Sequence, residues 1–100
     1  MHAVVNHLPL QKGIDWTALA RGFGEFEAMM RGDYPSFRGG TLIKVEDDKA
    51  ILIISFDNLE ALNDISKNVA APWFAEHVRP LLADAVSRSV GEVVCGSALR

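Results

Sequence analysis

A chain of 100 residues has room for one domain with a single two-layer core, so we expect residues 1–100 to form one domain, with 96–100 as a loose tail. Apolar residues make up 49% of the chain and charged residues 23%, which is typical of a globular protein and excludes extended disorder. The net charge of −3, with ten scattered Lys and Arg residues, argues against a nucleic-acid partner.

Membrane and secretory classes are also disfavoured. No apolar run approaches the roughly 20 residues that cross a bilayer, so we expect no membrane partner. A single cysteine, Cys95, cannot form an internal disulfide, and the first residues lack the charged and apolar segments of a secretory signal. These features predict a cytoplasmic protein in which Cys95 is a small buried hydrophobic residue.

The first predicted element is a strand from His2 to Leu10. Val4, Asn6 and Leu8 alternate onto one face of it. A polar amide among aliphatic side chains must find hydrogen-bond partners in the protein, in water or in a ligand. Asn6 is therefore either a structural amide or a residue that contacts a ligand.

Helical spacing of apolar residues predicts a helix from a capping Asp15 to about Arg31. A glycine and a proline soon after Arg31 end it. Gly22 and Gly24 lie inside this helix and cost it about 1 kcal/mol each relative to Ala. Either packing tolerates them, or they let another group approach the backbone closely.

A β-hairpin is predicted between Thr41 and Phe56, with its turn at Asp47-Asp48. Aspartate tolerates the unusual backbone angles that such turns require. The second arm, 51–56, is apolar on both faces, so both sides of this strand should be buried.

Two helices and a strand are predicted after the hairpin. The first helix runs from Leu59 to about Lys67, and a break is expected over 68–71. The second runs from about Pro72 to Ala85, with a kink at Pro80 because proline cannot donate a backbone hydrogen bond. The last strand is expected at about 88–95.

This order predicts an α+β fold: a ferredoxin-like βαββααβ chain with a four-stranded antiparallel sheet. Right-handed crossovers place the helices on one side of the sheet, and an open apolar sheet face is not tolerated on a soluble monomer. We therefore expect a homodimer that pairs through the open sheet face as a dimeric α+β barrel. A larger protein that covers this face is the alternative.

Several motifs resemble the antibiotic biosynthesis monooxygenase (ABM) family of the dimeric α+β barrel superfamily. They are Pro35-Ser-Phe-Arg-Gly-Gly40, the apolar strand ending at Phe56, Asn58-Leu-Glu-Ala-Leu62, Trp73-Phe74, and Val78-Arg79-Pro80-Leu81-Leu82. The resemblance spans nearly the whole chain, but its motifs are mostly structural. It implies a cofactor-independent monooxygenase that oxidises a small aromatic or phenolic, quinone-forming substrate with O2. A non-catalytic ligand-binding or assembly module of the same fold and a haem-binding, haem-degrading monooxygenase are the alternatives.

Three residues are candidates for a catalytic site: Asn6, Trp73 and His77. Trp73 and His77 lie four residues apart on one predicted helix, so they share a face that offers an indole for stacking and an imidazole for proton transfer. Asn6 also resembles the first-strand asparagine that haem-degrading relatives place against their ligand. We expect the three to line one cavity. The alternative is a tryptophan in the core or an interface and a solvated histidine.

The helix side of such a cavity is expected to be apolar. The substrate-pocket candidates are Trp16, Phe23, Phe26, Met30, Phe37 and Ile65. Aromatic and Met stripes of this kind also fill cores. A closed cavity beside Asn6 would favour catalysis, and a solid core would favour the module.

Metal and haem ligands are scarce. His2, His7, His77 and Cys95 are scattered, so no metal site is expected. Against the haem-degrading relatives, their tryptophan aligns with Ile65 and their ligand histidine falls near Ala75. No cofactor is therefore expected, with haem as the less favoured possibility. Arg38 and Arg79 either pair with an acidic substrate group or form surface salt bridges.

Overall fold

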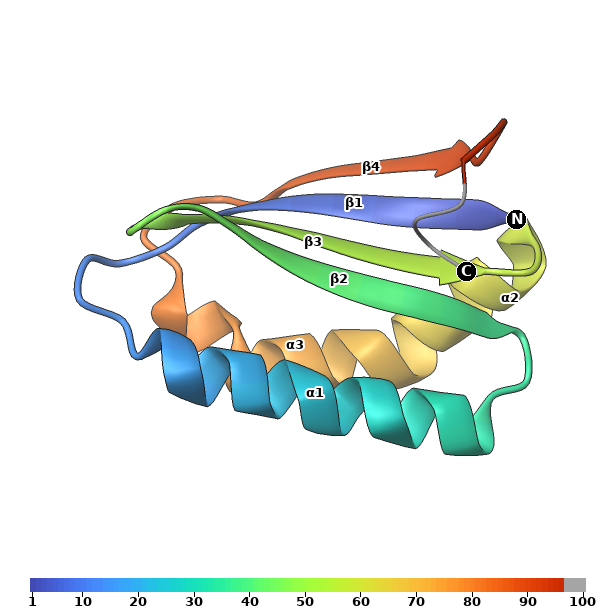
Figure 1. Ribbon diagram of the computed structural model, residues 1–100, viewed down its shortest axis with the longest axis horizontal. Helices are drawn as coiled ribbons and strands as arrows, with labels where there is room; N and C mark the ends of the chain where they lie inside the picture. Colours follow the sequence, from blue (N-terminus) through green and yellow to red (C-terminus); the bar gives the residue numbers. More distant parts are fainter. Residues whose placement is uncertain (97–100) are drawn as a thin grey trace.

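The computed structural model describes residues 1–96 and shows one antiparallel sheet with every helix on the same face (Figure 1). The strands, in the sheet order β2–β3–β1–β4, are β1 (His2–Pro9), β2 (Phe37–Glu46), β3 (Lys49–Phe56) and β4 (Ser87–Glu92). The helices are α1 (Trp16–Asp33), α2 (Leu59–Ile65) and α3 (Ala71–His77). The predicted ferredoxin-like fold with a four-stranded antiparallel sheet is confirmed. None of the helices described is both long and apolar enough to cross a membrane.

Helix α1 covers the β2–β3 half of the sheet. Its N-terminus is capped as predicted, because the Asp15 carboxylate accepts a hydrogen bond from the Ala18 backbone N–H at 3.0 Å. Phe23 lies directly on the sheet: a Cβ at Gly40 of β2 would be only 2.8 Å from Phe23 Cζ. Glycine at position 40 is what allows this close packing.

The two glycines inside α1 have no such role. A Cβ at Gly22 or Gly24 would meet nothing within 4 Å in the described part of the chain. The idea that they let a group approach the backbone is therefore not supported, and the helix tolerates them on its outer side.

The hairpin turns at Asp47-Asp48, as predicted, but by a different geometry. No non-glycine residue described has a positive φ, so the turn does not use the left-handed angles expected of its aspartates. A register shift between Lys44 and Glu46 adjusts the strands instead. The second arm of the hairpin, β3, places Leu52 and Ile54 against the helices and Ile53 on the open face.

The chain from α2 to α3 is continuous, so the break expected over 68–71 is wrong. Residues Ser66–Ala70 form a π-helical turn, η1, in which the Ala71 N–H reaches the Ser66 carbonyl. Helix α3 then ends at His77 instead of reaching Ala85. Pro80, which cannot donate a hydrogen bond, lies in a single 3-10 turn, η2 (Arg79–Leu81), where the chain leaves the helical layer.

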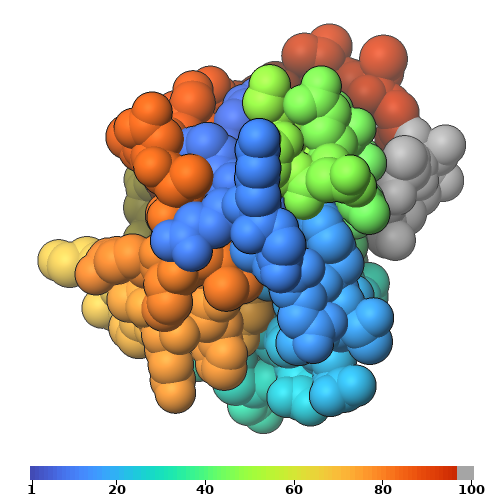
Figure 2. Space-filling model, turned by 90° about the vertical axis from the view of Figure 1, so that its left-hand side faces the viewer, coloured from blue at the N-terminus to red at the C-terminus, as the bar shows by residue number. Residues whose placement is uncertain are grey.

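One end of the sheet is tied by backbone hydrogen bonds. The N–H of Leu10 donates to the Asp48 carbonyl of the hairpin turn, and the N–H of Gln11 donates to the Leu81 carbonyl, both at 2.8 Å. In the end-on view of Figure 2 the blue linker after β1 runs between the green hairpin and the orange segment before β4. These bonds fix the start of β4 relative to β1.

Strand β4 is the least covered element. Among residues 1–96 it pairs only with β1, and each of its residues is exposed. It ends at Glu92, earlier than expected, so Val93 and Val94 lie outside the strand. Cys95 is exposed, so its predicted burial is wrong. Most of the predicted loose tail, 97–100, lies outside the described residues.

The sheet face opposite the helices is apolar along its centre. Its apolar side chains come from the first three strands: Ala3, Val5, Ile43, Ile51 and Ile53. Ile43 is 40% exposed in the single chain. This is the surface that the sequence predicted to need a cover.

Candidate functional site

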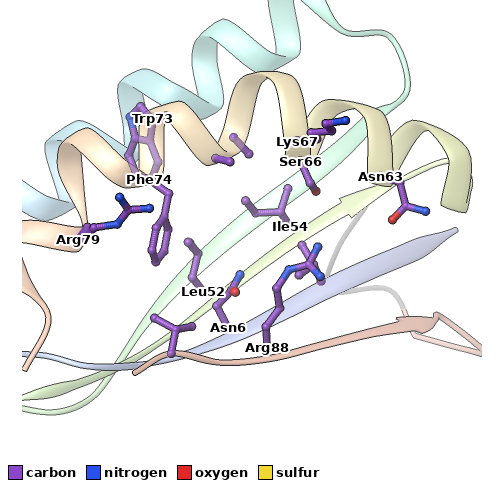
Figure 3. A pocket seen from close by; sticks show the side chains of 14 residues that line it. Asn6, Leu52, Ile54, Asn63, Ser66, Lys67, Trp73, Phe74, Arg79 and Arg88 are labelled. Atoms are coloured by element: carbon purple, nitrogen blue, oxygen red, sulfur yellow. The ribbon is translucent and has the colours of Figure 1, made fainter. Parts of the chain in front are cut away.

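A cavity of about 450 Å³ lies between strands β1, β3 and β4 and the helical segment from α2 to α3 (Figure 3). Aliphatic side chains, including Val4, Leu52 and Ile54, cover much of its sheet side. Phe74 reaches down from α3 toward the strands. The volume and the apolar walls suit a small organic molecule.

The register of the sheet sets the floor of the cavity. Asn6 of β1 pairs with Leu52 of β3 on one side and with Arg88 of β4 on the other. Directly paired residues project to the same face of a sheet. An aliphatic group, an amide and a guanidinium therefore stand in one row beneath the helices, as Figure 3 shows.

The π-helical turn forms part of the roof. Ser66, Lys67 and Ala70 of η1 line the cavity, and Trp73 follows on α3. A π turn widens the helix locally and is frequent at functional sites. Here it provides both polar and apolar groups to the same opening.

Asn6 is the buried polar side chain of this site. The residue is 9% exposed and lines the cavity. No side-chain hydrogen bond found among residues 1–96 involves its amide. A shielded amide without a protein partner is free to bond to a ligand or to water in the cavity.

Trp73 belongs to the cavity and to the core at once. Its ring centroid lies 4.6 Å from that of Phe26 on α1 and 6.4 Å from that of Phe23. These contacts hold the indole in place where it lines the cavity. The structure thus brings Asn6 and Trp73 to one opening.

His77 lies outside the cavity, so the expectation that it joins Asn6 and Trp73 there is wrong. It does share a helix face with Trp73, and the two rings stack with centroids 5.2 Å apart. That face turns toward α1, however, and the His77 side chain is 44% exposed, with Nε2 3.9 Å from a Glu76 carboxylate oxygen. No proton-transfer role in the cavity follows from this position.

The six predicted pocket-wall residues also do not line the cavity. They pack in or against the core: Trp16, Phe23, Phe26, Met30, Phe37 and Ile65. Four of the six lie on α1, which packs over β2, whereas the cavity lies over β1, β3 and β4 beneath the segment from α2 to α3. Trp16 is fixed at the hairpin, where its Nε1–H donates to the Asp47 carbonyl at 3.0 Å.

Other lining residues were missed from the sequence: Asn63, Ser66, Lys67 and Arg88. The alternation of the last strand could have placed Arg88 and Val90 on one face, but it carries no information on the register with β1. The helical residues were missed because polar side chains on a helix are usually solvated, and helical spacing alone does not place them at a cavity. Arg79 does line the cavity, whereas Arg38 forms an ion pair with Asp57.

The donor set of the cavity does not fit haem. Its lining residues include no His, Cys, Met or Tyr, the side chains that hold haem iron. Nor do residues 1–96 contain a group of three or more His, Cys, Asp or Glu side chains able to hold a metal ion.

A ferredoxin-like sheet with a ligand-sized cavity beneath one layer of helices defines the class of this chain. No protein-family profile and no curated sequence matches it. Solved structures do, and they confirm the resemblance to ABM proteins at the level of fold.

The similar structures cover almost the full length of both chains. A "putative antibiotic biosynthesis monooxygenase" from Caulobacter crescentus is 17% identical, with 93% of this chain and 89% of that chain covered and a TM-score of 0.75. SnoaB, a cofactor-independent oxygenase from Streptomyces nogalater, is 14% identical over 95% and 94%, with a TM-score of 0.71. A variant of MhuD with two manganese protoporphyrin IX molecules bound per active site is 17% identical over 97% and 98%, with a TM-score of 0.62.

Proposed function

We propose that this protein is a cofactor-independent oxygenase that converts a small phenolic or related aromatic substrate to a quinone with O2. The observation that carries the proposal is the buried Asn6 amide, which has no hydrogen-bond partner among residues 1–96 and lines a cavity of about 450 Å³ with aliphatic and aromatic side chains in its interior. The fold that holds this cavity is shared with SnoaB, a cofactor-independent oxygenase.

In this reaction the substrate supplies the electrons. An ionised phenol reduces O2, one oxygen atom is bonded to a ring carbon, and the O–O bond then breaks so that the second atom leaves as water. A naphthol plus O2 thus gives a naphthoquinone plus water, and no further reductant is required. The Asn6 amide N–H would donate to the phenolic oxygen, and the Phe74 and Trp73 rings would hold the substrate and exclude water.

Oxygen uptake with 1-naphthol and with anthrone tests the proposal. We expect consumption above the rate without protein, and a loss of about tenfold or more in Asn6→Leu, which removes one hydrogen-bond donor. Arg21→Met, an exposed change on α1 away from the cavity, should retain the rate. Uptake by Asn6→Leu equal to that of the unaltered protein would contradict this role.

A binding module is the second candidate, and one observation favours it. The cavity-lining residues include no Asp, Glu or His, so none of them is an ordinary general base. If aromatic probes bind in an Asn6-dependent way while oxygen uptake never exceeds the rate without protein, the module is correct and the oxygenase is not.

We also propose that two copies pair through the open sheet face. This would bury Val5, Ile51 and Ile53, which the single chain leaves partly exposed. Sedimentation velocity should give about twice the chain mass of 10.9 kDa, and Ile53→Lys should shift the particle toward one chain. A single-chain mass for the unaltered protein would rule out this pairing.

A further inference from the structure

The cavity is positively charged although the protein is negatively charged. Lys67, Arg79 and Arg88 all line it, and no Asp or Glu does. The whole chain, in contrast, carries 13 acidic and 10 basic residues and a net charge of −3. Three of the ten basic side chains are therefore gathered at one opening.

These three cations have no acidic partner in the described structure. The ion pairs found among residues 1–96 use Arg31, Arg38, Lys44, Lys49 and His77. The nearby Asp64 carboxylate accepts a hydrogen bond from the Asn68 side-chain amide. The positive charge at the cavity is thus not neutralised by ion pairs within this part of the chain.

The cations come from three separate elements around an apolar interior. Lys67 is on the π-helical turn, Arg79 begins η2, and Arg88 stands on β4 beside Asn6. Figure 3 shows their side chains spaced around the opening, with Leu52 and Ile54 on the floor between them. A flat aromatic ligand here would pack its ring against the side chains of Leu52 and Ile54 and would have its edge near the cations.

We propose that the natural ligand of this cavity is an aromatic acid, whose carboxylate pairs with one or more of these cations while its ring occupies the apolar interior. This rests on the proposed function only in taking the cavity as the ligand site. Arginine binds carboxylates with paired N–H groups, and a basic opening also raises the local concentration of anions. The same charge favours the ionised form of a phenol on the ring, which is the form that reduces O2.

Matched naphthalene probes test the charge preference by isothermal titration calorimetry. 2-Naphthoate and the neutral 2-naphthamide have nearly the same shape, and inorganic phosphate supplies charge without a ring. Because the three cations are exposed, each contributes modestly, and we expect naphthoate to bind about tenfold more tightly than the amide. Phosphate alone should bind far more weakly than naphthoate.

Variants that lack these charges test whether the arginines cause the preference for naphthoate. Arg79→Met with Arg88→Met should bring naphthoate close to the affinity of naphthamide, whereas the surface control Arg21→Met should leave the preference intact. If the double variant does not fold, added NaCl provides a second measurement on the unaltered protein. Salt should weaken naphthoate binding and leave naphthamide binding unchanged.

Equal affinity for the two probes, binding of neither, or a preference insensitive to both salt and the arginine changes would overturn the proposal. Oxygen uptake separates it from the proposed function. If naphthoate is preferred but 1-naphthol, anthrone and 1-hydroxy-2-naphthoate all consume no oxygen, the ligand assignment stands and the oxygenase fails. If 1-naphthol and 1-hydroxy-2-naphthoate are oxidised with equal efficiency and no acid preference, the oxygenase stands and the ligand assignment fails.

Discussion

The helical layer packs differently on the two halves of the sheet. Over β2 and β3, α1 places Phe23, Phe26 and Met30 in close contact with the strands, and Met30 is fully buried. Toward the β1–β4 edge, the segment from α2 to α3 leaves a cavity of about 450 Å³, which Leu52 and Ile54 of β3 also line. One half therefore supplies most of the packing, and the other has space for a ligand.

The difference arises from side-chain size and polarity on the strands. Gly40 on β2 lets an aromatic ring rest on the backbone, whereas β1 and β4 present Asn6 and Arg88 at the corresponding helix-facing surface. An amide and a guanidinium are costly to bury without partners, which favours space for water or a ligand beside them. The same sheet thus combines a packed half and an open half, and the following changes test that distinction.

The largest expected effect is on the packed half. Phe26→Ala removes a ring that is 2% exposed and contacts both Phe23 and Trp73, so the free energy of unfolding should fall by about 3–5 kcal/mol. Urea denaturation followed by circular dichroism measures it. Met29→Ala, on the same helix but 40% exposed, is the control and should change stability by about 0.5 kcal/mol or less. Equal losses in the two variants would contradict a packed α1 interface.

Gly40→Ala should have the next largest effect. The new methyl would be 2.8 Å from Phe23 Cζ, and moving a ring within a filled core costs about 1–3 kcal/mol. The melting temperature reports this loss. Gly22→Ala is the matched control, because its methyl meets no atom within 4 Å and Ala is the better helix former; it should stabilise by up to about 1 kcal/mol.

On the open half, Asn6→Leu should separate stability from function. The leucine would join Val4 and Leu8 without leaving a polar group unpaired, so the unfolding free energy should stay within about 1 kcal/mol of the unaltered protein. The ligand-dependent activity should nevertheless be lost. A drop in stability comparable to that of Phe26→Ala would show that Asn6 is structural.

His77→Ala should have the smallest effect. The imidazole is 44% exposed and lies outside the cavity, so we expect a change of about 0.5 kcal/mol or less in stability and no change in naphthoate affinity by calorimetry. A marked loss of binding would place this histidine in the site after all.

The sequence predicted the fold well because its signals are local. Periodicity placed α1 and the strands, and a carboxylate at position 15 marked where α1 begins. It also identified Asn6 as a polar residue on an apolar face. The pocket residues were predicted wrongly because their assignment depends on the distances between elements. A stripe such as Phe23 and Phe26 has the same sequence pattern whether it fills a core or lines a pocket.

The charged part of the site was harder to predict for a related reason. Arg88 becomes relevant only through its register with Asn6, which joins residues far apart in the sequence. Lys67 becomes relevant only through its place at the cavity, on a π turn that is a local departure from α geometry. Neither the pairing nor the departure has a short sequence signature.

The π-helical turn makes the shape of this site sensitive to single-residue insertions and deletions. Successive residues of an α-helix are rotated by about 100° around its axis, so removing one residue from 66–70 would rotate α3 by that angle relative to α2. Trp73 and Phe74 would then swing away from β1, and the hollow would change while the sheet and α1 stayed the same. Related chains could therefore acquire differently shaped hollows by gaining or losing one codon in this turn.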